Sequence, residues 1–290
     1  MVAVDLKITD FCPFGCPFCY QGSTLKGKDA DLEYLLEIFD FLNGQNVFEV
    51  VLGGGEPTLH EYFSSILIEL YKRKFTVGLT TKNKHFYKHF PEYKKFDDKE
   101  KKYIYIGLSF SNAEIIKEII DNMIEYLSEE KGYKNFVFTI RPHLIEGVDF
   151  KDGKELSDLL DRFSFLSFKK KYLSVVYDGV LLLGYKSVER GKEYIVNFDK
   201  QSIEEYLLYL KKKNFVSDKG IGVLVDSVIV ENYPKVFEGN LFFREGEYTF
   251  YIDAVKREIS ISSFSSHKFP FNDLYRDFED FLKQRFSLDV

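Results

Sequence analysis

The first two-thirds of the chain alternate short apolar runs with longer amphipathic runs. The apolar runs that we interpret as strands are Val2–Ile8, Val47–Leu52, Phe75–Thr80, Tyr103–Phe110 and Phe136–Ile140. The runs with apolar residues at helical spacing are Ala30–Leu42, Glu61–Lys74, Ala113–Leu127 and Glu155–Phe163. Alternation of this kind indicates βα units, whose strands lie parallel in one sheet. The pattern predicts an α/β fold, with Tyr172–Val176 and Val180–Leu183 as further strands and Val180–Leu183 as the sixth strand.

Three cysteines, the only ones in the 290 residues, lie in the loop after the first strand. Cys12, Cys16 and Cys19 have the spacing C-x3-C-x2-C. Four-iron clusters are usually held by four cysteine thiolates. Three thiolates leave one iron without a protein ligand, and a metal site that binds a substrate needs such an open position. The loop therefore predicts one [4Fe-4S] cluster with one iron open to another molecule.

Two other interpretations of the cysteines were weighed. Thiolates at short spacing also suit zinc, but no histidine lies near enough in the sequence to complete a familiar finger. Disulfides are disfavoured by the odd number of cysteines and by the absence of a signal peptide.

A glycine-rich turn follows the second strand, in the sequence Gly53-Gly54-Gly55-Glu56-Pro57. With both motifs in this order, the chain resembles the radical S-adenosylmethionine (radical SAM) superfamily. The resemblance implies that the open iron is chelated by the amino and carboxylate groups of the methionine moiety of SAM. It also implies that Gly54, Gly55 and Glu56 help to hold that amino group, and that Phe18 is the aromatic residue of the cysteine motif. Glycine permits close approach of the backbone, and a carboxylate accepts charge-assisted hydrogen bonds from an ammonium.

The resemblance further implies a partial (β/α)6 TIM-like barrel, whose working residues lie at the carboxyl ends of the strands. Ser109 and Ser111 lie where the family often places a residue that contacts the SAM ribose. Either serine could instead cap the helix that starts at Ala113. Strand ends carrying Lys82 and Arg141 could hold the SAM carboxylate or a substrate anion, and Arg141 is the better partner because its guanidinium binds in a bidentate manner. A structural salt bridge is the alternative role. The segment Leu183-Gly184-Tyr185-Lys186 resembles the adenine-contacting segment of the family, with Gly184 and Tyr185 as candidate contacts.

The chain changes character after about residue 193. We expect a barrel over residues 1–193 and a small α+β appendage over residues 194–290, with helices at Ile203–Lys212 and Phe271–Phe286. Alternating apolar residues predict strands at Ile221–Val230, Leu241–Arg244, Tyr248–Val255 and Glu258–Ile261. Three short stretches resemble the auxiliary-cluster modules of peptide-modifying radical SAM enzymes, with every cysteine replaced: Asp226–Val228, Thr249–Asp253 and Ser260–Phe264. A degenerate module and a chance similarity both remain open, and the segment can hold no all-cysteine cluster.

The resemblance implies an enzyme that reductively cleaves SAM and makes a 5′-deoxyadenosyl radical, which abstracts a hydrogen from a substrate. An electron donor such as flavodoxin or ferredoxin is the expected partner. The substrate is a peptide or a small molecule, with a small metabolite or nucleotide as the alternative. A start of the first strand at about Val2 leaves no room for an N-terminal leader-binding domain, which disfavours the peptide. A non-enzymatic iron–sulfur binding or sensing protein is a third hypothesis.

Composition restricts the partners further. A net charge of −6 and a pI near 5.6 argue against a nucleic-acid-binding surface, which is normally basic. No apolar run approaches the roughly 20 residues that a membrane-spanning helix needs. We therefore expect a cytoplasmic protein, in a compartment where thiols stay reduced.

Overall fold

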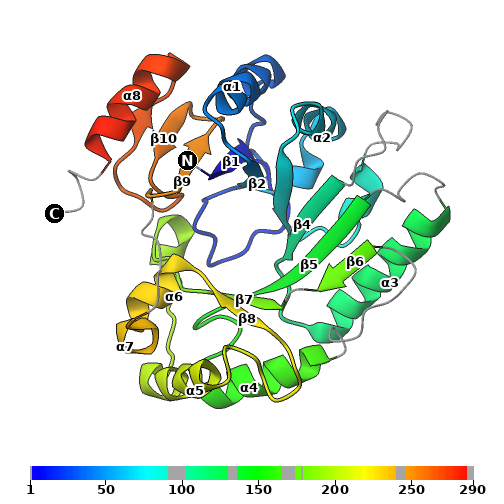
Figure 1. The fold of residues 1–290 in the computed structure, drawn as a ribbon, viewed down its shortest axis with the longest axis vertical. Coiled ribbons are helices and arrows are strands. Elements are labelled where there is room, and N and C mark those ends of the chain that lie inside the picture. The colour runs from blue at the N-terminus through cyan, green and yellow to red at the C-terminus, as the bar shows by residue number, and fades with distance from the viewer. Residues whose placement is uncertain are drawn as a thin grey trace.

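A computed structural model describes residues 2–90, 102–129, 136–164, 174–177, 179–239 and 246–285. Its centre is a strongly curved, mostly parallel sheet (Figure 1). The first five strands are β1 (Ala3–Thr9), β2 (Glu49–Gly54), β3 (Thr76–Thr81), β4 (Lys102–Leu108) and β5 (Phe136–Ile145). They are neighbours in the order of the sequence, and every pair is parallel. The predicted α/β fold is therefore confirmed.

The sixth position in the sheet is shared by two short strands. β6 (Ser174–Tyr177) pairs in parallel with the first half of β5, and β7 (Val180–Leu183) pairs in parallel with its last three residues. Gly179 between them has φ +125°, a conformation that favours glycine. The prediction of Val180–Leu183 as the sixth strand is confirmed, and β6 joins the same edge of β5.

Strands from the last third of the chain extend this sheet at both edges. β8 (Val223–Val225) pairs in parallel with β7, and β9 (Thr249–Asp253) pairs in parallel with β1. β10 (Glu258–Ser260) and β11 (Phe269–Pro270) follow β9 in antiparallel order. Within the described ranges the sheet runs from β11 to β8 without closing, as in a partial barrel. The division at residue 193 and the auxiliary-module origin of the last third remain predictions.

Helices cover the outer, convex side of the sheet (Figure 1). They include α1 (Leu32–Gly44), α2 (Phe63–Lys72), α3 (Ala113–Glu129), α4 (Gly153–Arg162), α5 (Lys200–Lys212) and α8 (Leu274–Gln284). Successive side chains of β1 point to opposite sides of the sheet. Val4, Leu6 and Ile8 are buried in the apolar core with the helices, whereas Asp5 and Lys7 line the inside of the curve. The polar inner side is where a ligand can be held.

Aspartate side chains mark most helix starts. Asp31, Asp152, Asp199 and Asp273 each accept hydrogen bonds from backbone amides in the first turn of α1, α4, α5 and α8, respectively. The sequence predictions, which followed apolar spacing alone, missed several of these starts by two or three residues.

One predicted strand is wrong beyond its first half. Within Ile221–Val230, β8 ends at Val225, and Asp226 caps α6 (Ser227–Asn232) by accepting a hydrogen bond from the Ile229 amide. The helix α7 (Pro234–Phe237) follows. The predicted strand Leu241–Arg244 lies outside the described residues. Three short 3-10 helices complete the described elements: η1 (Pro57–Leu59), η2 (Phe86–His89) and η6 (Glu189–Lys192).

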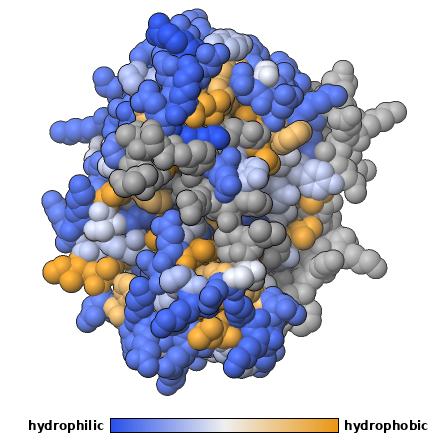
Figure 2. Space-filling model, turned by 60° about the vertical axis from the view of Figure 1, so that its left-hand side comes forward, coloured by the Kyte–Doolittle hydropathy of each residue, from blue (hydrophilic) through white to orange (hydrophobic). Residues whose placement is uncertain are grey.

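The face in Figure 2 is mostly hydrophilic, with hydrophobic side chains in small separate groups. Among the described helices, none combines the length and the apolar composition that crossing a bilayer requires.

Candidate functional site

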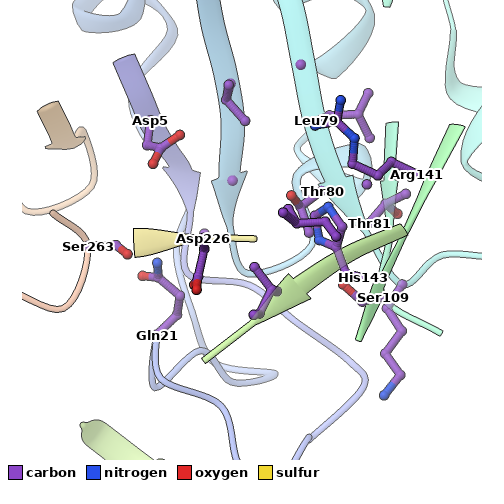
Figure 3. A pocket seen from close by; sticks show the side chains of 18 of the residues that line it. Asp5, Gln21, Leu79, Thr80, Thr81, Ser109, Arg141, His143, Asp226 and Ser263 are labelled. Atoms are coloured by element: carbon purple, nitrogen blue, oxygen red, sulfur yellow. The ribbon is translucent and has the colours of Figure 1, made fainter. Parts of the chain in front are cut away.

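A cavity of about 1030 Å³ lies inside the curve of the sheet, and residues at the carboxyl ends of the strands line it. All the residues predicted from the sequence to bind the cluster or SAM line this cavity: Cys12, Cys16, Phe18, Cys19, Gly54, Gly55, Glu56, Ser109, Ser111, Arg141, Gly184 and Tyr185. Figure 3 shows Gln21, Asp226 and Ser263 on one side, facing Thr81, Ser109 and His143 on the other. The cavity continues along the inside of the sheet to Val2 and Phe48, which lie near the amino ends of β1 and β2.

The cysteine loop is closed by backbone hydrogen bonds. The Cys12 amide donates to the Thr24 carbonyl at 2.9 Å, and the Cys19 amide donates to the Cys16 carbonyl at 3.2 Å. All three thiols are free and partly exposed to the cavity. Burial raises the pKa of the Cys12 thiol, and the neighbouring charges of Cys19, Glu56 and Cys16 raise it further. The three sulfurs thus lie close enough to interact electrostatically.

The donor set fits a multi-iron cluster. Within the described ranges, no three His, Cys, Asp or Glu side chains are grouped round a point that would hold a single metal ion. In a four-iron cluster each thiolate binds a different iron, so the sulfurs need not converge on one point. Three thiolates around one cavity are consistent with that chemistry.

The glycine turn packs directly against the strand that leads into the cysteine loop. The Gly55 amide donates to the Thr9 carbonyl at 2.7 Å, and the Glu56 amide donates to the Phe11 carbonyl at 2.8 Å. A Cβ on Gly54 would lie 2.3 Å from the Thr9 carbonyl oxygen, and one on Gly55 would lie 2.1 Å from the Phe11 carbonyl oxygen. The close approach that requires glycine here is therefore between two backbone segments, in addition to any approach of a ligand.

Glu56 is 1% exposed and connects the glycine turn to β3. Its Oε1 accepts hydrogen bonds from the hydroxyls of Thr58, at 2.6 Å, and Thr81, at 2.7 Å, while Oε2 accepts from the Lys82 amide at 2.9 Å. Burial raises the pKa of the Glu56 carboxyl, and these hydrogen bonds oppose the rise. The carboxylate already has donors within the chain, so its contact with the SAM amino group remains a prediction.

Asn112, and neither serine, caps α3. Its Oδ1 accepts hydrogen bonds from the Glu114 and Ile115 amides at 2.9 Å and 3.1 Å. The capping alternative for Ser109 and Ser111 is therefore wrong, and both line the cavity. A hydrogen bond from Ser111 lowers the pKa of the Asp149 carboxyl, although burial raises it overall.

Arg141 lies within β5, which extends to Ile145, and not at the strand end where we expected it. Figure 3 shows its side chain directed back along the inside of the sheet, away from Ser109. Its charge acts on Glu49, whose pKa is raised by burial and lowered by the guanidinium. Binding of the SAM carboxylate by Arg141 remains a prediction.

His143, two residues further along β5, packs its ring where a Cβ of Gly107 would lie. Burial, with the positive charges of Arg141 and Lys186, lowers the pKa of His143 to about 3. The imidazole is therefore neutral at physiological pH.

The end of β7 is enclosed by the last third of the chain. A Cβ on Gly184 would lie 2.3 Å from the Val228 side chain of α6, so this glycine makes room for a helix. The Tyr185 hydroxyl donates to the Gly191 carbonyl at 2.6 Å. The adenine contacts of Gly184 and Tyr185 remain predictions.

Two charged residues at this wall, Lys186 and Asp226, received no role of their own from the sequence. The Lys186 ammonium lies 4.8 Å from the ring centroids of both Tyr20 and Phe264, and 3.8 Å from Asp226. Asp226 also accepts the Gly184 amide at 3.0 Å. An aspartate directly before Ser227 is a helix-start signal, but the apolar residues on both sides of it favoured a strand.

Three comparisons place this geometry among known proteins. The model of the "Radical SAM superfamily" matches residues 6–160, more than half of the chain. A PqqA peptide cyclase of Bradyrhizobium diazoefficiens is 35% identical over 82 residues, which is 28% of this chain and 20% of that protein. The fold is similar to that of Streptococcus suis SuiB bound to precursor peptide SuiA, with TM-score 0.65 and 13% identity over 97% of this chain and 64% of SuiB. It is also similar to anSMEcpe with bound AdoMet, with TM-score 0.60 and 13% identity over 99% of this chain and 84% of anSMEcpe.

Proposed function

The chain belongs to the radical SAM superfamily, whose enzymes use a [4Fe-4S] cluster and SAM. We therefore propose that Cys12, Cys16 and Cys19 hold a single cluster at which SAM is reductively cleaved. The observation that carries this proposal is that the three cysteines line one cavity together with the glycine turn. When bound, the cluster and SAM supply a 5′-deoxyadenosyl radical that abstracts hydrogen from a substrate.

The chain's own residues would hold and orient SAM. The turn at Gly54 and Gly55 lines the cavity and is fixed against the cysteine loop, so it keeps its position when a ligand binds. Ser109 would contact the ribose, and Tyr185 would lie against the adenine. Preorganised donors and acceptors of this kind position a ligand without reorganisation at the moment of reaction.

Residues of the last third of the chain would shield the reaction from water. Tyr251 and Ser263 line the same cavity as the cysteines, as does Asp226. A site that makes a radical has to exclude water and side reactions. The last third therefore supports productive turnover as part of the cavity wall.

We propose a peptide as the substrate. The fold match to SuiB, whose structure holds precursor peptide SuiA, covers 97% of this chain and so includes the last third as well as the barrel. The PqqA peptide cyclase match supports the same substrate class. The chain spans only 64% of SuiB, and that match covers 20% of the cyclase, so the activity and partners of those whole proteins are not transferred. A small-molecule substrate is the second candidate, because about 1030 Å³ is at the upper end of the volume of small-molecule pockets.

Hydrogen transfer to the SAM-derived product distinguishes the two substrates. The anaerobically reconstituted protein is incubated with SAM, dithionite and either a uniformly deuterated peptide digest or a uniformly deuterated small-molecule extract. Mass spectrometry of 5′-deoxyadenosine should show deuterium from the digest and none from the extract. Deuterium from the extract alone would refute the peptide assignment, and the Cys16→Ala variant controls for transfer that does not depend on the cluster.

A further inference from the structure

Lys82 is held rigidly at the carboxyl end of β3, beside the cysteine loop. Its backbone amide donates to Glu56 Oε2 at 2.9 Å, and the preceding residue Thr81 donates its hydroxyl to Oε1 at 2.7 Å. The Asn83 amide donates to the Thr81 hydroxyl at 3.0 Å. Since Glu56 is buried, the backbone on both sides of Lys82 has a fixed position relative to the glycine turn.

The Lys82 side chain reaches across the cavity to the central cysteine. Its Nζ lies 3.3 Å from Cys16 Sγ, within hydrogen-bonding distance of a sulfur acceptor. The same ammonium lies 5.7 Å from the centroid of the Phe18 ring, which itself packs edge-on against Tyr194. The charge is thus held against the cysteine loop by a sulfur and by an aromatic ring.

The Lys82 charge influences groups beyond its direct contacts. It lowers the pKa of the Asp149 carboxyl, which also lines the cavity, against the effect of burial. A partly desolvated cation acts more strongly than one on the open surface, because the effective dielectric constant is lower. Since the Lys82 ammonium lies 3.3 Å from Cys16 Sγ, its field acts on the sulfur that would bind the cluster.

We propose that Lys82 is a redox-tuning residue, which raises the reduction potential of the cluster held by Cys12, Cys16 and Cys19. The inference rests on the proposed function, since it requires that the cysteines hold a cluster. The potential of an iron–sulfur cluster depends on net charge, on hydrogen bonds to the sulfurs and on solvent exposure. Reduction from the 2+ to the 1+ state adds one electron from an external donor, and a donor cation on a cysteine sulfur stabilises the added negative charge. Lys82 therefore makes the one-electron reduction that precedes SAM cleavage more favourable.

An EPR-monitored redox titration without SAM tests this role directly. The samples are the reconstituted wild type, Lys82→Met, Lys82→Arg and the control Lys84→Met, which removes an exposed lysine two residues away. Dithionite supplies the electron, and signals are normalised to protein-bound iron so that partial loading does not move the midpoint. We expect Lys82→Met to lower the equilibrium constant for reduction of the cluster about tenfold, which corresponds to a midpoint potential lower by about 59 mV for one electron. Lys82→Arg keeps the charge and Lys84→Met leaves the site intact, so both variants should have the midpoint potential of the wild type.

The outcomes separate this proposal from the proposed function. If Lys82→Met has the wild-type midpoint while the wild type binds a four-iron cluster and cleaves SAM, only the role of Lys82 is overturned. The same holds if Lys82→Met weakens SAM binding without moving the midpoint, because Lys82 is then a SAM ligand. A Lys84→Met shift equal to that of Lys82→Met would also overturn it. A wild type that binds no four-iron cluster overturns the proposed function itself.

Discussion

Adding one methyl group to Gly55 should separate the glycine turn from the cysteine loop. The new Cβ would lie 2.1 Å from the Phe11 carbonyl oxygen and 2.7 Å from its carbon, so the two backbone segments must move apart. Two hydrogen bonds hold them together, from the Gly55 amide to Thr9 and from the Glu56 amide to Phe11. Their loss costs about 1 kcal/mol each, and overpacking of a filled site costs about 1–3 kcal/mol. We expect Gly55→Ala to lower the free energy of unfolding by about 3–5 kcal/mol.

Gly53 supplies a matched control in the same turn. A Cβ at Gly53 meets no atom within 4 Å, so Gly53→Ala adds the same methyl group without a clash. Its effect on stability should be small and favourable, about 0.4–1 kcal/mol, because alanine restricts the unfolded chain. Urea unfolding of the metal-free variants, followed by circular dichroism, measures the difference in the free energy of unfolding. Iron content after reconstitution shows whether the cysteine loop still binds the cluster. Unfolding free energies of Gly55→Ala and Gly53→Ala within about 1 kcal/mol of each other would refute the packing argument.

Three further changes test the buried polar groups. Burial lowers the pKa of Lys7, but Asp253 and Asp10 raise it overall. Lys7→Met should cost about 3–5 kcal/mol in stability, because it leaves the 1%-exposed Asp253 without its cation. Denaturant unfolding measures this loss, and a second change, Asp253→Leu, should partly reverse it. Burial lowers the pKa of His60 below 6.5, so its contribution is complete above pH 6.5 and is lost as the pH falls. The difference in stability between wild type and His60→Gln should therefore shrink between pH 7.5 and pH 5.5, and a difference that does not change with pH would contradict this. Glu56→Ala leaves four donors without their acceptor and should cost roughly 1–3 kcal/mol in stability. It should also weaken SAM binding measured by calorimetry, whereas exposed Glu61→Ala should do neither.

Much of the site geometry follows from the sequence because its motifs follow neighbouring parallel strands. Cys12 comes soon after β1, and Glu56 comes soon after β2. Parallel strands end at the same edge of a sheet, so two motifs at strand ends must meet there. The sequence therefore predicted which residues gather at the cavity, although their roles in binding remain predictions.

The remaining features depend on long-range contacts, or on a local cap that competes with the apolar pattern. β9 pairs with β1 from more than 240 residues away, and alternating apolar residues indicate a strand without indicating its partner. The run from Val223 to Val230 has the composition of a strand, but the Asp226 carboxylate accepts the Ile229 amide and starts a helix. Arg141 was expected at a strand end, but β5 continues past it and its side chain turns inward. The β9 pairing and the extension of β5 are tertiary contacts, whereas the cap at Asp226 is a local signal that overrides the apolar spacing.

SAM cleavage by the iron-loaded protein tests the central claim most directly. Iron and 5′-deoxyadenosine are quantified in the same anaerobic sample after reconstitution and addition of SAM and dithionite. We predict about four irons per chain, with 5′-deoxyadenosine formed by the wild type and lost in Cys16→Ala. A wild-type protein that holds about four irons per chain and yet forms no 5′-deoxyadenosine would contradict the account, as would a Cys16→Ala variant that cleaves SAM at the wild-type rate.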